Sequence, residues 1–383
     1  MCRDDTEYMR LALAEAAKGL GRTSPNPCVG AVIVRDNVVV GRGYHRRAGT
    51  PHAEVNAIAD AGSSACRGAT IYVTLEPCNH SGRTPPCTRA ILAAGIRRVV
   101  VGMKDPNPSV AGGGMEFLAA QGIEVTGGVL AEECRRLNFP FLKHVTSGLP
   151  WVVMKAGMSL DGRISYRQGA GGVITGAASH RLVHRLRDRF DAILIGVGTA
   201  LVDDPSLTTR IAERVGRDPL RVVLDSRLRL PVDARMLQQS SDAATWIFCG
   251  PLASSTREAE LTDAGAMVHR VGVNEQGRVD LEQVLVKLGR AGLTSVLVEG
   301  GAAVHGSFLR RDLVDEVCLF LAPFFIGDEG MPVISGFGID SAGAAARLHD
   351  VQIERPGDDI LVRGILHCPE DATARTQGAC RQW

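Results

Sequence analysis

The sequence predicts two successive α/β domains, because it is long and because one pattern of strands and helices runs through it twice. A chain of 383 residues exceeds one ordinary core, since domains run roughly 100 to 200 residues each. Apolar strand-like segments alternate with helical ones, stop near "TSGLP", and begin again at Trp151. Such alternation is typical of helices layered over a mostly parallel sheet. We therefore expect domains over residues 1–145 and 150–367.

The elements of the first domain follow in order along the chain. A helix is expected from Tyr8 to Lys18, then a strand in "VGAVIVRDNVVVGRGY", a helix from "PHAEVNAIADA" and a strand in "GATIYVTLEPC". A helix in "TRAILAAG", a strand in "RRVVVGMKDP" and a helix in "LAEECRRLNFPFLKHV" complete the domain.

The second domain is expected to hold buried strands separated by helices and turns. These strands are "WVVMKAGMS", "FDAILIGVGTAL", "LRVVLDS", "ATWIFCG", "SVLVEGG" and "EVCLFLAPFFI". Glycines cluster at the strand ends, where an open α/β sheet binds its ligands. Residues 368–383 show no apolar periodicity, so we expect a disordered tail there.

Composition narrows the classes of partner. No run of eighteen uncharged apolar residues is present and the N-terminus does not resemble a signal peptide, so we expect a cytoplasmic protein without a membrane anchor. A net charge of +1 gives no field for nucleic acid, which favours small-molecule partners. The ten cysteines fit reduced thiols better than a disulfide framework. The sequence leaves a homo-oligomer open.

One group of residues in the first domain predicts a metal site. Thr50 and Pro51 are expected to open a helix, which places His52 and Glu54 at its start, and Cys78 follows a strand while Cys87 opens the next helix. One imidazole and two thiolates supply three tetrahedral zinc ligands and leave a fourth position for water. Glu54 is placed to move protons to and from that water. The alternatives are a redox pair of cysteines, which leaves the His-x-Glu unexplained, and plain packing.

A His-x-Glu followed by Pro-Cys and a second cysteine is the mark of nucleobase deaminases, although eight residues separate the cysteines here where two are usual. Asn26 and His45 flank strand ends and are candidates for holding a pyrimidine, with loop hydrogen bonding as the alternative. His80 lies between the cysteines, where solvent or substrate contact is favoured over zinc binding. A turn-forming role is expected for Asp105 and Asn107.

The motifs "PNPCVGAVIV", "GYHRRAGTPHAEVNAI", "TLEPCNHSGRTPPC" and "VVVGMKDPNPSVAGGG" resemble the deaminase half of the bifunctional riboflavin-biosynthesis deaminase-reductase, whose zinc loop has this longer spacing. The resemblance implies a cytidine-deaminase-like three-layer α/β/α domain. It also implies zinc ligation by His52, Cys78 and Cys87 and proton transfer by Glu54. The implied reaction is hydrolytic removal of the C2 amino group of 2,5-diamino-6-(5-phosphoribosylamino)pyrimidin-4(3H)-one.

The second domain gives a weaker signal from its residues alone. "VEGG" between a strand and "AVHGSFLRR" is a glycine-rich turn that can present N–H groups to a phosphate, but many α/β turns have two glycines for steric reasons. "MKAGMSLDGRIS", "GVGTALVDDPSLTTR" and "LVEGGAAVHGSFL" resemble the reductase half of the same family, a domain similar to dihydrofolate reductase. The resemblance implies NADPH contacts at Gly157, Thr199, Asp203, Ser226, Gly301, Ala302, Ala303, Val304, His305, Gly306 and Ser307.

The same resemblance implies that Arg187, Leu207, Arg210 and Glu299 hold the sugar-phosphate substrate, 5-amino-6-(5-phosphoribosylamino)uracil, while NADPH reduces its ribosyl group to ribityl. For the arginines the alternative is a surface ion pair. The family usually has a serine and a tryptophan where this chain has Gly171 and Val173, so a weaker cofactor contact is expected. Two other functions stay open: deamination of another nucleobase, and a zinc-stabilised sensor or scaffold whose degenerate second domain binds a nucleotide.

Overall fold

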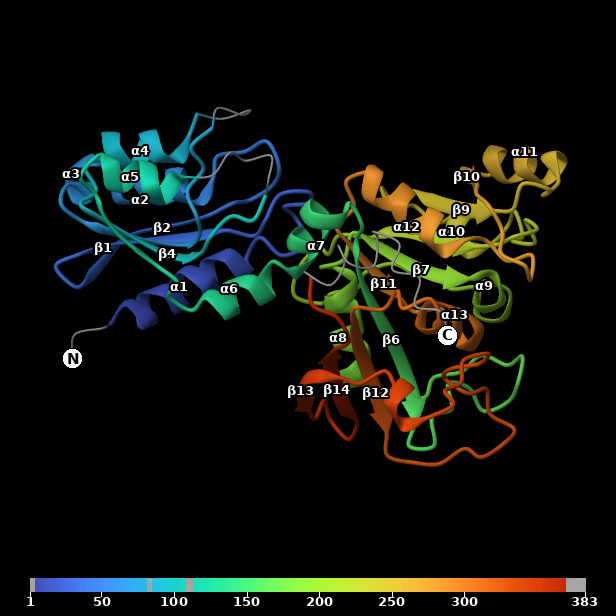
Figure 1. Cartoon of the computed structure of the whole chain (residues 1–383). Helices are drawn as coiled ribbons and strands as arrows, with labels where there is room; N and C mark the ends of the chain where they lie inside the picture. The colour runs from blue at the N-terminus through green and yellow to red at the C-terminus, as the bar shows by residue number, and fades with distance from the viewer. Residues whose placement is uncertain (1–3, 81–84, 108–112, 370–383) are drawn as a thin grey trace. The chain divides into compact units, whose positions relative to one another are not determined.

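The computed structural model describes residues 4–80, 85–107 and 113–369 (Figure 1). The chain divides between Gly148 and Leu149 into two compact units, called unit 1 and unit 2 below. The tail predicted over 368–383 falls almost entirely outside the described residues. In the described part of the chain, no helix has the length and apolarity needed to cross a membrane.

Unit 1 contains a five-stranded sheet in the order β2-β1-β3-β4-β5. β1 pairs antiparallel with both β2 and β3, whereas β3, β4 and β5 are parallel. The expectation of one strand over "VGAVIVRDNVVVGRGY" was wrong, because Asp36 and Asn37 take positive φ values of 50° and 62° and turn it into a hairpin. The strands are Gly30–Arg35 (β1), Val38–Tyr44 (β2), Thr70–Leu75 (β3), Arg98–Met103 (β4) and Glu124–Gly127 (β5).

Helices cover both faces of this sheet and make three layers (Figure 1). α1 and α6 lie on one face, and α2, α4 and α5 on the other. Gly43 lets α2 approach β2 closely, since a Cβ there would lie 2.3 Å from the backbone nitrogen of Ala57. The helices are Asp5–Ala17 (α1), Ala53–Ala61 (α2), Ser63–Cys66 (α3), Cys87–Ala93 (α4), Gly114–Ala120 (α5), Ala131–Leu137 (α6) and Phe139–Ser147 (α7).

The last two helices of unit 1 replace one long predicted helix. The chain breaks at Asn138, which directly precedes α7. Its side chain accepts a hydrogen bond from the Cys28 N–H at 2.8 Å and donates to the Cys28 carbonyl at 3.0 Å. These tertiary bonds fix the break, and Pro140 in the first turn of α7 fits a helix start.

Unit 2 contains a nine-stranded sheet in the order β10-β9-β8-β7-β11-β6-β12-β14-β13. Neighbours from β10 to β12 are parallel, and β14 pairs antiparallel with β12 and β13. The strands are Trp151–Ser159 (β6), Ala192–Gly196 (β7), Leu220–Leu224 (β8), Thr245–Cys249 (β9), Ala266–Arg270 (β10), Ser295–Val298 (β11), Glu316–Ala322 (β12), His349–Glu354 (β13) and Ile360–Ile365 (β14).

Helices follow most of these strands, and the core lies between helices and sheet. The central strands contribute apolar side chains that are fully buried, as at Leu194, Val222 and Val296. Leu285 and Phe308 bring α12 and α13 into the same core. The helices are Ala177–Arg187 (α8), Val197–Asp203 (α9), Arg235–Gln238 (α10), Ser255–Asp263 (α11), Leu281–Arg290 (α12) and Ala302–Arg310 (α13), with a 3₁₀ turn at Ala342–Ala344.

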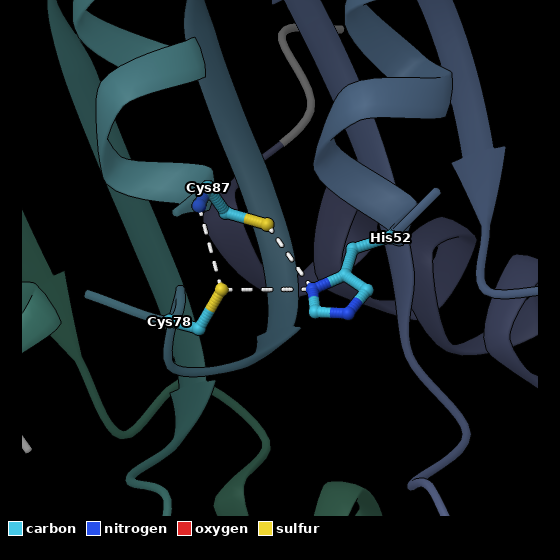
Figure 2. Close-up of side chains that lie close together, drawn as sticks. All are labelled: His52, Cys78 and Cys87. Atoms are coloured by element: carbon cyan, nitrogen blue, oxygen red, sulfur yellow. Dashed lines mark hydrogen bonds between the residues drawn. The ribbon is translucent and has the colours of Figure 1, made fainter. Parts of the chain in front are cut away.

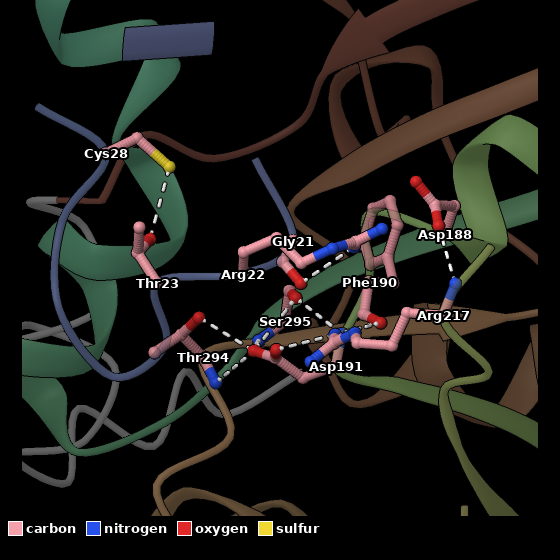
Figure 3. A network of polar contacts seen from close by, with 10 residues as sticks. All are labelled: Gly21, Arg22, Thr23, Cys28, Asp188, Phe190, Asp191, Arg217, Thr294 and Ser295. Atoms are coloured by element: carbon pink, nitrogen blue, oxygen red, sulfur yellow. Dashed lines mark hydrogen bonds and ion pairs between the residues drawn. The ribbon is translucent and has the colours of Figure 1, made fainter. Parts of the chain in front are cut away.

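The position of β11 determines which strand ends lie side by side in unit 2. This strand lies between β6 and β7, although β8, β9 and β10 separate it from them in the chain. Asp191 fixes its amino end, because this carboxylate accepts hydrogen bonds from the backbone and hydroxyl groups of Thr294 and Ser295 and pairs with Arg217 (Figure 3). The carboxyl ends of β8, β7, β11 and β6 are therefore neighbours, as at the ligand-binding edge of open α/β sheets.

Candidate active sites

Three elements of unit 1 bring together the side chains predicted to bind a metal (Figure 2). His52 caps the N-terminus of α2, Cys87 is the first residue of α4, and Cys78 follows β3. His52 Nδ1 lies 3.6 Å from Cys78 Sγ and 3.3 Å from Cys87 Sγ. The helix begins at Ala53, with His52 and not Thr50 as its cap.

These spacings suit one zinc ion. A thiolate sulfur and an imidazole nitrogen bound tetrahedrally to one zinc lie about 3.5 Å apart, given bond lengths of about 2.3 and 2.0 Å. The candidate ligand atoms of all three side chains lie within 4.8 Å of one another. The donor set therefore fits zinc, and the imidazole uses Nδ1.

The two thiols differ in their acidity. A hydrogen bond from Cys87 lowers the pKa of Cys78 to about 4, and the Cys87 backbone N–H also donates to the Cys78 sulfur at 3.4 Å. The same contact raises the pKa of Cys87, which is buried. The first N–H of α4 thus helps to stabilise the Cys78 thiolate, and a bound cation would stabilise both thiolates.

Glu54 lies beside these ligands in the first turn of α2 and is 3% exposed. Burial raises the pKa of Glu54 to about 7, and the negative charge on Cys78 contributes. A carboxyl group with such a pKa can both take and give a proton near neutrality. The predicted His-x-Glu pair therefore places a proton-transfer group next to the ligand set.

His45 and Asn26 border the same site. The His45 ring meets the His52 ring edge-on, with centroids 5.3 Å apart, and its Nδ1 lies 3.3 Å from the Pro51 carbonyl. Asn26 Nδ2 lies 3.1 Å from His45 Nε2. If Nδ1 carries the proton and donates to Pro51, Nε2 accepts from the Asn26 amide. His80 is exposed, beside residues outside the described part of the chain.

Glu76, which no sequence motif indicated, is buried two residues before Cys78. Its carboxylate accepts hydrogen bonds from the backbone N–H of Asp105 at 3.2 Å and of Met115 at 3.1 Å. Asp105 in turn accepts from the Asn107 N–H at 2.9 Å, in agreement with its expected turn-forming role. An acidic residue inside the apolar run "IYVTLEPC" was the available signal, because a buried carboxylate needs such partners.

In unit 2, the residues expected to bind NADPH lie along the carboxyl edge of four neighbouring strands. Ser226 follows β8, Thr199 lies on α9 directly after β7, Gly301 follows β11 and Gly157 lies on β6. Gly301 has a φ of 74°, and a Cβ there would lie 2.9 Å from Thr199 Oγ1. The chain thus brings two helix starts close together at the middle of the sheet.

The expected segment from Gly301 to Ser307 divides into two parts. The N–H groups of Val304 and His305 already donate to the Gly301 carbonyl, so the first N–H groups of α13 are the ones that can face an anion. His305 is 1% exposed, with Nδ1 3.0 Å from the Val333 carbonyl. A Cβ on Gly306 would lie 1.9 Å from the Ser335 carbonyl oxygen, so this glycine serves close packing.

The residues expected to hold the sugar-phosphate substrate differ in their surroundings. Arg187 does not form a surface ion pair: its guanidinium donates two hydrogen bonds, at 2.9 and 2.8 Å, to Glu299, whose side chain is 8% exposed. Lys155, which the sequence analysis did not select, lies 3.6 Å from the same carboxylate. Burial by itself raises the pKa of Glu299, but the charges of Arg187 and Lys155 outweigh it and lower the pKa to about 2.

Leu207 and Arg210 lie on the segment after α9. Leu207 is 3% exposed, packs in the core of unit 2 and has a φ of 54°, so only its backbone can face a ligand. The Arg210 side chain is exposed.

The two departures from the family pattern are exposed. Asp203 fills the space beside Gly171, since a Cβ there would lie 2.0 Å from Asp203 Oδ1. Val173 is 65% exposed, and the Tyr166 hydroxyl lies 3.5 Å from its carbonyl. The Tyr166 ring stacks on Phe324 with centroids 6.4 Å apart.

Comparison with known proteins agrees with this division of the chain. Residues 2–103 match the family model of the cytidine and deoxycytidylate deaminase zinc-binding region. Residues 150–362 match that of the RibD C-terminal domain. The predicted fold class, a cytidine-deaminase-like domain followed by a dihydrofolate-reductase-like domain, is confirmed.

Relatives match nearly the whole chain. It is 42% identical to the riboflavin biosynthesis protein RibD of Bacillus amyloliquefaciens over 94% of this chain and 95% of that protein, and 39% identical to the Escherichia coli RibD over 94% and 98%. The solved RibD structure from Acinetobacter baumannii superposes with a TM-score of 0.83 at 36% identity, covering 94% of this chain and 98% of that chain. A Thermotoga maritima deaminase/reductase superposes with a TM-score of 0.82 at 37% identity, over the same shares. The chain therefore belongs to the RibD family of bifunctional riboflavin-biosynthesis enzymes, which join a zinc-dependent deaminase domain to an NADPH-dependent reductase domain.

Proposed function

We propose that unit 1 hydrolyses the C2 amino group of 2,5-diamino-6-(5-phosphoribosylamino)pyrimidin-4(3H)-one. The observation that carries the proposal is the convergence of His52, Cys78 and Cys87 beside the buried carboxyl group of Glu54. Zinc held by these three side chains would supply a water molecule that is acidic near neutral pH. The oxygen of this water becomes the C2 carbonyl of the product, and the amino group leaves as ammonia.

Glu54 moves the protons of this reaction. Its carboxylate takes a proton from the attacking water and delivers it to the leaving amine, and its buried position in the first turn of α2, beside the ligand set, suits both steps. The Asn26 amide is held by His45 at 3.1 Å and orients the pyrimidine ring by hydrogen bonding. Glu76 acts indirectly, by fixing the backbone at Asp105 and Met115.

Unit 2 reduces the ribosyl group of the deaminated product. NADPH, when bound, would supply the hydride for C1′; in this reduction the bond from C1′ to the ring oxygen breaks and that oxygen takes up a proton. Gly157, Thr199, Ser226 and the first turn of α13 would hold the cofactor, together with Asp203. Lys155, Arg187 and Glu299 face the ribose, and the exposed Arg210 binds the phosphate.

The limits of the two activities follow the expected domains, with the deaminase in residues 1–145 and the reductase in residues 150–367. The substrates are small molecules, as the net charge of +1 suggests. Reduced thiolates at the metal site suit a cytoplasmic enzyme. Self-association into a homo-oligomer stays a prediction.

The test uses each substrate separately. Metal-replete protein is expected to release ammonia from the diaminopyrimidinone without NADPH, and metal-free protein is expected to oxidise NADPH only when the deaminated compound is supplied. Release of ammonia from cytidine or adenosine but not from the diaminopyrimidinone would contradict the proposed substrate. Binding of NADPH without oxidation would favour the sensor or scaffold function instead.

A further inference from the structure

Three consecutive residues after α9 have their backbones held by three side chains. The Thr208 carbonyl accepts a hydrogen bond from Arg187 Nη1 at 3.2 Å. The Thr209 N–H donates to Asp218 Oδ1 at 2.7 Å, and the Arg210 N–H donates to His184 Nδ1 at 3.2 Å. We propose that His184 and Asp218 are positioning residues that hold this segment so that the Arg210 guanidinium faces the phosphate group of the reductase substrate.

Each of the three side chains is itself fixed. Arg187 is held by Glu299 through two hydrogen bonds, and Asp218 accepts a second bond from Ser241 Oγ at 2.7 Å. His184 lies on α8, one turn before Arg187. The segment is therefore tied to a helix, to the end of β11 and to a neighbouring loop, which limits its freedom before any ligand binds.

The choice of histidine at position 184 suits this task. An imidazole that accepts from the Arg210 N–H must be neutral, because a protonated ring has no lone pair to offer. Burial, together with the charges of Arg187 and Arg210, lowers the pKa of His184 to about 4 and keeps the ring neutral at physiological pH. A neutral acceptor orders Arg210 without cancelling its charge, as a carboxylate in that place would do.

Arg187 and Arg210 consequently have different roles. The charge of Arg187 is balanced by Glu299. Within the described part of the chain, Arg210 forms no ion pair with a carboxylate, and its Nη2 lies 3.4 Å from His184 Nε2. The contact with His184 Nε2 uses only one N–H group of the guanidinium, so the other N–H groups are available for an anion.

This inference rests on the proposed function of unit 2, and its test separates the two. Rates of NADPH oxidation are measured with 5-amino-6-(5-phosphoribosylamino)uracil and with its dephosphorylated analogue, while ammonia release by unit 1 reports an intact chain. Arg210→Ala is expected to raise KM for the phosphorylated substrate about a hundredfold, as loss of a charge-assisted contact would. An unchanged KM in this variant would contradict the proposed role of Arg210 itself.

His184→Leu is expected to raise the same KM about tenfold and to leave kcat and the dephosphorylated substrate within about twofold, since one hydrogen bond is lost. His184→Asn should restore KM, because its Oδ1 can stand where Nδ1 stood, whereas His184→Gln should not. In the double variant His184→Leu/Arg210→Ala, KM for the phosphorylated substrate should be no higher than in Arg210→Ala alone. Arg181→Leu, an exposed change on the same helix, is the control and should leave KM unchanged.

The inference fails if Arg210→Ala raises KM while His184→Leu does not. It also fails if His184→Leu weakens both substrates equally, since that would indicate general damage to unit 2. If the His184→Leu protein no longer binds NADPH, Asp218→Leu decides the question, with Asp218→Asn as the variant that keeps the acceptor for the Thr209 N–H. A KM unchanged in Asp218→Leu would then overturn the inference.

Discussion

Two glutamates, one in each unit, are almost completely shielded from water and yet have opposite acidities. Burial raises the pKa of Glu54 to about 7, next to the thiolate of Cys78. Glu299 is also desolvated, but Arg187 and Lys155 outweigh this and lower its pKa to about 2. The charges of neighbouring groups, and not burial by itself, therefore decide the pKa of a buried carboxyl group.

The same contrast extends to the ligands. The unit 1 site gathers groups that carry or approach negative charge, and it needs a cation to complete it. In unit 2, Lys155 and Arg187 both pair with the carboxylate of Glu299, so this cluster keeps an excess of positive charge. The two clusters thus carry excess charge of opposite sign.

The largest effect is expected from Glu54→Gln, which removes the titrating group of unit 1. Ammonia release should fall about 1,000-fold, the usual scale for loss of a general acid–base. Zinc content should stay at the wild-type level because the metal ligands are unchanged. NADPH oxidation with the deaminated compound should also stay at that level because unit 2 is unchanged. Glu116→Gln, an exposed change in the same unit, is the control. Near-normal ammonia release by Glu54→Gln would show that Glu54 does not transfer the proton.

Replacement of a metal ligand is expected to have the second-largest effect and to abolish the activity of unit 1 alone. Cys78→Ser is expected to reduce bound zinc from about one ion per chain to a small fraction, together with ammonia release, because three protein ligands hold a catalytic zinc. Reduction of the deaminated substrate should persist. Cys66→Ala, at a fully buried cysteine outside the cluster, should keep its zinc when both proteins are analysed by metal spectrometry. Retained zinc in Cys78→Ser would disprove the ligand set.

Glu299→Gln should destabilise unit 2, because Arg187 and Lys155 lose their shared anion. We expect a loss of about 3 kcal/mol in the free energy of unfolding at pH 7, the scale for breaking a buried pair. Trp151 and Trp246 both lie in unit 2 and report its unfolding by fluorescence. An equal stability of both proteins would mean that the pair contributes nothing net.

The difference in the free energy of unfolding between wild type and Glu299→Gln should depend on pH in a definite direction. The pKa of Glu299 is lower in the folded protein, about 2, than the value of about 4.3 expected when unfolded. Its stabilisation is therefore complete above about pH 4.3 and is lost as the pH falls toward 2. The gap between wild type and Glu299→Gln should narrow over this range in denaturant titrations. A stability difference that grows as the pH falls would contradict a pKa of Glu299 that is lowered by folding.

Gly301→Ala should weaken NADPH binding, since the added methyl group meets Thr199 Oγ1 at 2.9 Å and the residue keeps a φ of 74°. KM for NADPH is expected to rise about tenfold, from strain and a displaced helix start. Gly292→Ala is a matched control, because Gly292 has a φ of 80° with no atom within 4 Å of an added Cβ. A similar rise in KM for NADPH in both variants would show that the rise comes from strain at a positive φ and not from the contact with Thr199.

The smallest effect is expected at Val173, which is 65% exposed. Val173→Trp restores an aromatic ring and should lower KM for NADPH about threefold, in keeping with one added stacking contact. Gly171→Ser should not help, because its Cβ would fall on the Asp203 carboxylate. Unchanged cofactor affinity in Val173→Trp would indicate that the ring does not face the cofactor in this chain.

The residues of unit 1 could be selected from the sequence because their chemistry is local. His52, Glu54, Cys78 and Cys87 have unusual types at helix and strand junctions, and the structure brings them together. The hairpin turn at Asp36 and Asn37 escaped prediction, although both residue types tolerate positive φ.

The site of unit 2 could not be derived in that way. Arg187 and Glu299 are more than a hundred residues apart in the sequence, and Lys155 lies on a third element. Their contact depends on β11 entering the sheet between β6 and β7, which no local pattern encodes. The family resemblance supplied most of these residues, but it gave no indication of how His184 and Asp218 hold Arg210.

The central claim is that one chain performs both reactions in succession, and the stoichiometry of a coupled assay tests it most directly. Starting from the diaminopyrimidinone with NADPH, we expect one NADPH to be oxidised for each ammonia released. A zinc chelator should stop both signals, while NADPH oxidation should resume when the deaminated compound is added. Ammonia release without NADPH oxidation, or oxidation that starts before any ammonia appears, would contradict the claim.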